Sequence, residues 1–335
     1  LGLISAAEQI GGRGPDASVP DLFLSAEKLT HAGRYQEAYP IAVQAQKLAG
    51  QFSTNDARYA SSLNQVGLLC HMLGRYAEAE QSYRRAIVII EEDTGQQRLL
   101  TLALQNLCSL YMDHGARYSR AERLMRRALE VSAGLFESDS PEIGAMLANL
   151  GTAHMMQRHD SEARVFFNRA LAILENSPEL YQTNVACLLM NLGILTARRG
   201  DSAGALPLLL RAAALYEQRL GSSHPELLKP LMNLGQLYLV RKRWGMAQES
   251  FKRAAAIAET VRTEDPILSM VLSSYATALR RNGRKDEARE IEGRAKMLSV
   301  FQPGSTENMT VHVSDLMSNP RGKTPSEFAE RETAK

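Results

Sequence analysis

Asparagine returns at one fixed place along the chain, two residues before a glycine or a cysteine. The members are Asn106, Asn149, Asn191 and Asn233, and Asn64 stands one place earlier in its own segment. A side-chain amide offers both donors and an acceptor, so a row of amides could hold the backbone of an extended peptide whatever its side chains. Each asparagine could instead bond a neighbouring loop and serve only internal packing. The spacing is compatible with both interpretations.

Basic side chains gather in the C-terminal half of the same pattern, and the ones nearest to the asparagine series are Arg198, Lys229 and Arg281. Arg198 lies seven places after Asn191, which puts both on one side of a helix. A guanidinium can bind a carboxylate through two parallel hydrogen bonds. These residues predict a binding surface that prefers an acidic peptide, and the alternative is a solvated basic face.

Histidine and cysteine are the other residue types that could do chemistry. No two histidines show His-Glu-x-x-His spacing, and His154 occupies a place held by Tyr111 and Tyr238 in other segments, which indicates packing. The three cysteines lack the spacing of a zinc site and fit small buried side chains; they are Cys70, Cys108 and Cys187. The sequence therefore predicts no catalytic residue, no metal site, no cofactor and no enzyme activity.

A repeated segment carries all of these residues. Gly151, Gly193 and Gly235 follow one another at steps of 42 residues, and each is followed by alanine 12 and 19 residues later. Apolar residues recur at helical spacing on both sides of a turn, and a fixed period of this size is typical of a helix–turn–helix array. We expect the glycine to face the first alanine, because two helices cross closely only where side chains are small. A bulky apolar residue between the alanines would fill the remaining volume.

Three regions are predicted on this basis. Residues 1–20 read as a leader or linker, and residues 21–300 as an all-α solenoid of about seven helix pairs, the last one capping the array with a charged helix. Residues 301–335 lose the period and contain helix breakers, so we expect a largely disordered tail. In the third pair Cys108 takes the glycine's place, and it is separated from the first alanine, Ala121, by one residue more than in the other pairs. We assign this extra residue to the turn between the two helices.

Composition excludes several classes of protein. Of 335 residues, 44% are hydrophobic and 23% charged, as in a folded protein. The 39 Lys plus Arg nearly balance 37 Asp plus Glu, which gives no case for bulk nucleic-acid binding. No apolar run reaches the ~18 residues of a membrane span. The compartment is not fixed: a cytoplasmic protein is the first expectation, and a processed exported protein is the alternative.

The repeated residues resemble tetratricopeptide repeats, and more narrowly the 42-residue variety found in kinesin light chain. The match rests on Asn-Leu-Gly, on a Gly-Arg-Tyr-like turn, and on Ala-Glu-x-x-Tyr/Phe-x-Arg-Ala, as in residues 79–86. The stretch Leu220-Gly221-Ser222-Ser223-His224-Pro225 is similar to that family's link between repeats. The resemblance covers residues 22–299, and it is specific for fold but not for function.

This resemblance implies a right-handed superhelix whose first helices line a concave groove that binds a protein or peptide segment. It therefore implies a non-catalytic interaction scaffold. Two other functions fit the same pattern: a regulatory sensor whose superhelix changes pitch when a peptide or small ligand binds, and the non-catalytic arm of a larger regulator. The partner and the oligomeric state are not determined by the pattern.

Overall fold

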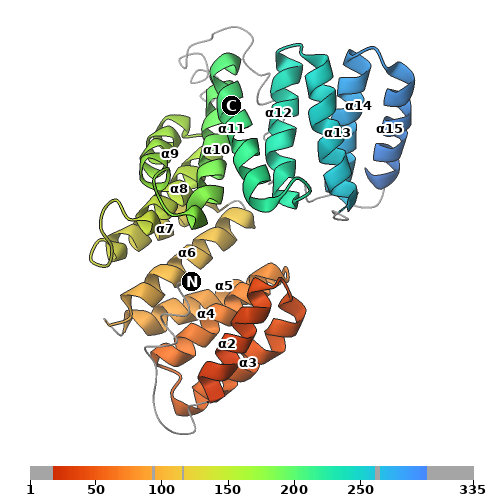
Figure 1. Cartoon of the computed structure of the whole chain (residues 1–335). Helices are drawn as coiled ribbons and strands as arrows, with labels where there is room; N and C mark the ends of the chain where they lie inside the picture. Colours follow the sequence, from red (N-terminus) through yellow and green to blue (C-terminus); the bar gives the residue numbers. More distant parts are fainter. Residues whose placement is uncertain (1–17, 93–94, 115–116, 261–264, 300–335) are drawn as a thin grey trace, which may run out of the picture. The chain divides into compact units, whose positions relative to one another are not determined.

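The structure is a computed structural model that describes residues 18–92, 95–114, 117–260 and 265–299 (Figure 1). Within these ranges it contains fourteen α-helices and no strand, which confirms the all-α class and the helix–turn–helix repeats. The predicted tail, and all but the last residues of the predicted leader, lie outside the described residues.

Each repeat contributes a first and a second helix. The first helices are α2 (Ser18–His31), α4 (Ala57–Met72), α6 (Gln97–Asp113), α8 (Pro141–Met156), α10 (Gln182–Arg198), α12 (Leu228–Val240) and α14 (Asp265–Arg281). The second helices are α3 (Tyr35–Phe52), α5 (Tyr76–Glu91), α7 (Tyr118–Ser132), α9 (Asp160–Leu174), α11 (Ser202–Leu220), α13 (Trp244–Thr260) and α15 (Lys285–Ser299). Short 3₁₀ turns, η2 (Glu179–Tyr181) and η3 (Pro225–Leu227), precede α10 and α12.

The helices group into two compact units, residues 1–166 and 167–335, and the division falls inside α9. In unit 1 each helix from α2 to α8 packs on the next, and in unit 2 the same holds from α10 to α15 (Figure 1). Alternate helices also touch: α2 contacts α4, α4 contacts α6, α10 contacts α12, and α12 contacts α14. Successive first helices are therefore neighbours from α2 to α6 and from α10 to α14.

The recurring glycine makes room for the bulky residue of the second helix. A Cβ built on Gly67 would lie 2.8 Å from the Tyr83 ring, and one on Gly235 would lie 2.5 Å from the Phe251 ring. Both rings are fully buried. These rings fill the volume that we expected the bulky residue to occupy. The contact expected between the glycine and the first alanine stays a prediction for these two repeats. The ring is the largest group in the seam, so it reaches across and takes the space that a missing Cβ leaves.

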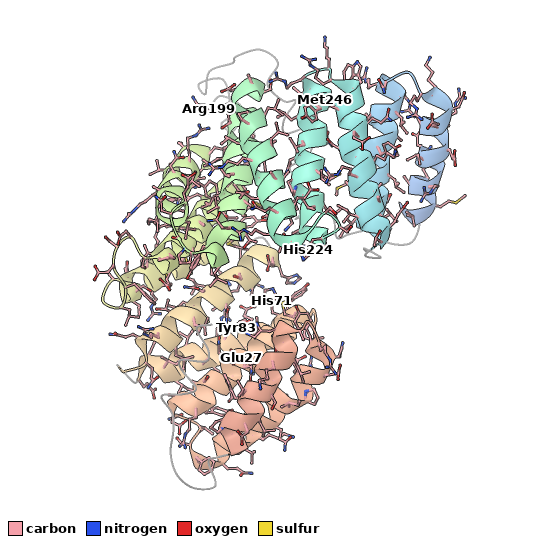
Figure 2. The ribbon with its side chains drawn as sticks, in the orientation of Figure 1. Glu27, His71, Tyr83, Arg199, His224 and Met246 are labelled. Atoms are coloured by element: carbon pink, nitrogen blue, oxygen red, sulfur yellow. The ribbon has the colours of Figure 1, made fainter. Side chains whose placement is uncertain are left out.

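The hairpin turns share a backbone conformation that favours glycine. Gly74 at the turn between α4 and α5 has a φ of 74°, and Gly200 between α10 and α11 has a φ of 85°. Lys242 stands at the same place between α12 and α13 with a φ of 57°. Figure 2 shows Arg199 and Met246 at this turn end of the unit 2 helices and His224 at the opposite end, where the links between repeats lie.

Candidate functional site: the first-helix face

Two side-chain amides join successive first helices in unit 1. Asn106 Nδ2 on α6 donates to Asn64 Oδ1 on α4 at 3.1 Å. Gln65, and not Asn64, stands two places before Gly67, and its Nε2 donates to the Phe23 carbonyl on α2 at 3.1 Å. The sequence prediction did not include Gln65, because it considered only asparagine. Gln65 could have been found from its position two places before Gly67. These two amides already serve the stacking of neighbouring repeats.

The remaining asparagines differ in exposure. Asn191 and Asn233 in unit 2 are each 5% exposed, whereas Asn149 on α8 of unit 1 is half-buried. Another amide of unit 2, Gln236, donates from Nε2 to Ser274 Oγ at 3.4 Å and so connects α12 to α14. Asn149 thus keeps more solvent contact than either of the two unit 2 asparagines.

The three basic residues singled out from the sequence lie in different surroundings. Arg198 is half-buried in the last turn of α10, and Arg281 is exposed in the last turn of α14. Lys229 Nζ lies 3.8 Å from Glu226 Oε2 at the start of α12, so part of its charge is compensated within the chain. Arg281 presents the most accessible positive charge of the three.

Methionine on the first helices divides between core and surface. Met155 and Met232 are buried, whereas Met72 at the end of α4 is 47% exposed. Met156 at the end of α8 is half-buried. The two interpretations of these residues, plain core and adaptable contact surface, therefore apply to different members of the set.

A polar triad, which the sequence pattern did not reveal, repeats at two seams of unit 1. Tyr111 Oη on α6 donates to Glu80 Oε1 at 2.8 Å and accepts from Arg84 Nη2 at 2.9 Å, and both partners belong to α5. One repeat later, His154 Nε2 on α8 lies 3.5 Å from Glu122 Oε1 and 3.4 Å from Arg126 Nη2, both on α7. Each triad ties a first helix to the second helix of the preceding repeat.

His154 is 5% exposed, and its ring stacks on Phe166 with centroids 5.1 Å apart. Burial holds the pKa of His154 below its ordinary value, and the Glu122 carboxylate only partly offsets this effect. Burial by itself would raise the pKa of Glu122, but hydrogen bonds from Gln157 and Arg126 outweigh it and leave that pKa below its usual range. The carboxylate is therefore charged and the imidazole neutral at pH 7.

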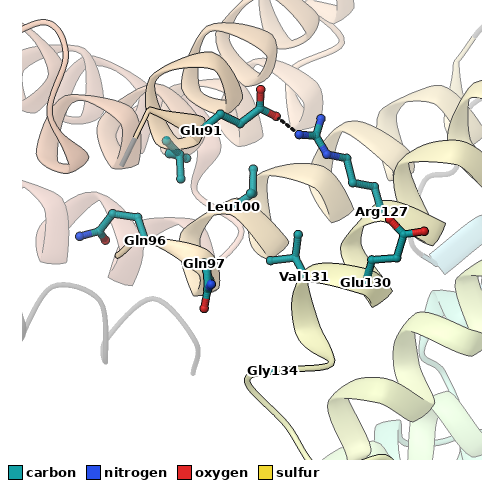
Figure 3. Close-up of a pocket in the computed structure, with 9 residues that line it drawn as sticks. Glu91, Gln96, Gln97, Leu100, Arg127, Glu130, Val131 and Gly134 are labelled. Carbon is teal, nitrogen blue, oxygen red and sulfur yellow. Dashed lines mark ion pairs between the residues drawn. The ribbon is translucent and has the colours of Figure 1, made fainter. Parts of the chain in front are cut away.

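A pocket of about 450 Å³ opens among the ends of α5, α6 and α7 (Figure 3). Ile90, Leu100 and Val131 form its apolar wall, and the Arg127 Nη2–Glu91 Oε1 ion pair, 2.5 Å long, lies at its edge. None of the residues singled out from the sequence lines it. The pocket, to which the first helix α6 contributes Leu100, therefore includes none of the asparagine and basic residues predicted to bind a peptide.

The described ranges contain no group of three or more His, Cys, Asp or Glu side chains placed to hold a metal ion. Of the helices that the structure describes, none combines the length and the apolar character needed to span a membrane.

Comparison with known proteins gives consistent results. A family model described as tetratricopeptide repeat matches residues 24–92, 99–176 and 184–260, which is more than half of the chain. Human tetratricopeptide repeat protein 19, mitochondrial, is 29% identical over 118 residues. That match covers 34% of this chain and 31% of the human protein, so the chain spans about a third of that relative's length.

A solved structure of low sequence identity shares the architecture. The Rap conjugation gene regulator of the plasmid pLS20, in complex with the Phr peptide, has a TM-score of 0.58 and 14% identity over 87% of this chain and 78% of its own. Nearly identical repeats from a kinesin light chain of Podosopora anserina have a TM-score of 0.49 and 21% identity, covering 61% of this chain and 96% of theirs.

Proposed function

Because this chain belongs to the tetratricopeptide-repeat family, we propose that it is a non-catalytic scaffold that binds a protein or peptide segment along its first helices. Repeats of this family generally serve protein–protein interaction and are generally not catalytic. The proposal concerns the finer point, namely which surface binds and what kind of segment it prefers.

One observation carries the proposal: the residue five places after the recurring small residue stays in contact with solvent on successive first helices. In unit 1 this position holds Met72, 47% exposed, and Asp113, whose side chain is 65% exposed. In unit 2 it holds Val240, 36% exposed, and Arg281, also exposed. Asp113 also pairs with His71 at 3.2 Å, but its side chain, like the other three, keeps contact with solvent. The residue types at this position vary from repeat to repeat, as expected of positions that contact a partner.

A peptide is the ligand that this arrangement suits best. Each first helix offers one variable side chain, and Asn149 adds a partly solvated amide that could bond a peptide backbone. The Rap regulator with the similar fold is in complex with the Phr peptide, which supports the same kind of ligand here. In unit 2 the charged residues at the variable position are Arg198 and Arg281, which favours acidic side chains in the part of the peptide bound there.

The test of the acidic preference uses a fluorescein-labelled peptide rich in glutamate and its glutamine counterpart, with fluorescence polarisation as the readout. We expect tighter binding of the glutamate peptide and a loss of about two- to fivefold in affinity for Arg281→Glu, the range of one exposed ion pair. Lys252→Glu on α13 makes the same change in charge at an exposed residue of a second helix and serves as the control. Equal affinities for Arg281→Glu, Lys252→Glu and wild type would refute the acidic preference.

A second comparison tests the amide independently of charge. Asn149→Ala on α8 removes a half-buried amide from a first helix, and Asn168→Ala on α9 removes an exposed amide from a second helix. We expect only Asn149→Ala to weaken binding of peptides recovered from a display library, with unchanged melting temperatures for both variants. If both variants bind as wild type does, Asn149 serves packing alone.

A regulatory peptide sensor is the second candidate function, because the regulator of similar fold is in complex with a peptide. Small-angle X-ray scattering distinguishes the two. A scaffold keeps its radius of gyration when peptide is added, whereas a sensor changes it by more than the mass of the peptide explains.

A further inference from the structure

We propose that His154 makes the seam between α7 and α8 a pH-sensitive joint, which loosens when the imidazole takes up a proton. The neighbouring seam between α5 and α6 has the same triad with Tyr111 in place of the histidine, so that triad lacks a group that titrates near neutral pH. His114 also lies at that seam, stacked on Tyr76, but outside the triad.

The neutral imidazole fits its site better than the imidazolium does. When Nδ1 carries the proton, Nε2 can accept from Arg126 Nη2 at 3.4 Å. Nδ1 is buried, and no described residue forms a hydrogen bond with it. In this tautomer the Nδ1 N–H lacks an acceptor, and it does so in the imidazolium as well. Protonation removes the acceptor at Nε2, so the Arg126 guanidinium then faces an N–H and a positive charge instead of a lone pair, which is unfavourable.

The charges around His154 come from three places. From α7, Arg126 opposes protonation and Glu122 favours it. From the turn before α9, His159 opposes protonation, and its ring centroid lies 5.7 Å from that of His154. From α9, Glu162 favours protonation but is exposed to solvent, which screens its charge.

Burial, Arg126 and His159 lower the pKa of His154, and Glu122 and Glu162 raise it. The lowering effects are the larger, so this pKa lies below its ordinary value. In the unfolded chain the same histidine titrates near 6.5, so it binds its proton at a higher pH than in the folded chain. The free energy of unfolding of this seam therefore falls as the pH drops through the ordinary histidine range.

Amide hydrogen exchange of the whole chain tests the proposal. Exchange is measured at about pH 7.5 and about pH 5.5, on either side of the ordinary histidine pKa, and corrected for the intrinsic pH dependence of the rate. In wild type we expect several-fold less protection of α8 at the lower pH. In His154→Tyr the pH effect on α8 should disappear, because the seam then has the same residue as its neighbour.

The reciprocal variant provides a second test, which does not depend on whether His154→Tyr folds. Tyr111→His should transfer the effect, so that α6 loses protection at the lower pH while α8 behaves as in wild type. If His154→Tyr does not fold, as judged by circular dichroism, His154→Gln replaces it with a neutral polar side chain. An α8 whose protection is equal at both pH values in wild type, or which still responds to pH without His154, would overturn the proposal.

Discussion

Arg253 reaches back one repeat: its Nη2 lies 3.0 Å from Glu217 Oε1, which ties α13 to α11. The same relationship occurs three more times, always between an arginine directly before the second alanine of a repeat and a glutamate 35 or 36 residues earlier. The other pairs are Arg127–Glu91, Arg211–Glu175 and Arg294–Glu259. We call this set of pairs the arginine ladder; it joins successive second helices. The sequence shows the recurring Arg-Ala pair, but the ladder was not predicted from it.

Each arginine–glutamate pair of the ladder should contribute a small coupling free energy to stability, and this coupling should depend on salt. Both side chains of the Arg253–Glu217 pair are 41% exposed, so a double-mutant cycle with Arg253→Gln and Glu217→Gln should give a coupling free energy of about 0.2–1 kcal/mol at low salt. At about 1 M salt the Debye length is about 3 Å, and the coupling should fall towards zero. Chemical denaturation with urea, which leaves ionic strength unchanged, is the measurement. A coupling that is insensitive to salt would contradict the electrostatic account.

Gly235→Ala should destabilise the chain even though alanine is the better helix former. The added Cβ would meet three ring carbons of Phe251 at 2.5–2.8 Å, and that ring is fully buried. Overpacking costs about 1–3 kcal/mol and helix propensity returns about 1 kcal/mol, so we expect a net loss of up to about 2 kcal/mol. Gly245→Ala on α13 has no atom within 4 Å of its Cβ and should leave stability unchanged or raise it. Urea unfolding of both variants decides the matter.

Tyr83→Phe should stabilise the chain. The Tyr83 side chain is fully buried, its hydroxyl has no hydrogen-bond partner among the described residues, and burial raises its pKa. An unsatisfied buried hydroxyl costs about 1–3 kcal/mol, and Phe167 and Phe251 hold the equivalent place in other repeats, so a gain of about 1 kcal/mol is expected. Tyr111→Phe is the matched control, because Tyr111 Oη bonds Glu80 and Arg84; the same substitution should there reduce the free energy of unfolding.

Lys242→Gly should stabilise the turn between α12 and α13. Lys242 is exposed and has a φ of 57°, a conformation that costs a residue with a Cβ about 1–2 kcal/mol. Glycine relieves that cost but adds about 0.4–1 kcal/mol of unfolded-state entropy, so the net gain should be at most about 1.6 kcal/mol. Gly74→Ala, at a φ of 74° with open space around its Cβ, should show the opposite sign. Thermal melts of the two variants moving in the same direction would exclude this explanation.

Cys108 should be unreactive in the folded chain. Burial raises the pKa of its thiol to about 12, so at about pH 8 only about one molecule in ten thousand carries the thiolate that attacks iodoacetamide. We expect mass spectrometry to find no label on Cys108 without denaturant and full labelling in guanidinium chloride. Ser273→Cys, at an exposed position on α14, is the positive control and should be labelled in the folded chain.

The sequence alone was sufficient to identify the helix pairs. The step of 42 residues between glycines, the helical spacing of apolar residues and the Gly-containing turns are local properties. The helical spacing and the turns can be recognised within one repeat, and the step by comparing two, because helix periodicity and the steric freedom of glycine depend only on near neighbours in the chain. The one extra residue before Ala121 also fell where expected, since α6 and α7 are both intact on either side of the turn.

Only the tertiary structure decided which side chains meet across repeats. It showed that Gln65 as well as Asn64 bonds a neighbouring first helix, and it put the Phe251 ring against Gly235. It also brought Arg253 to a glutamate 36 residues away. The reason is physical: partners in neighbouring repeats are chosen by how far each helix is rotated about its axis, and that rotation is set by the packing of the whole seam.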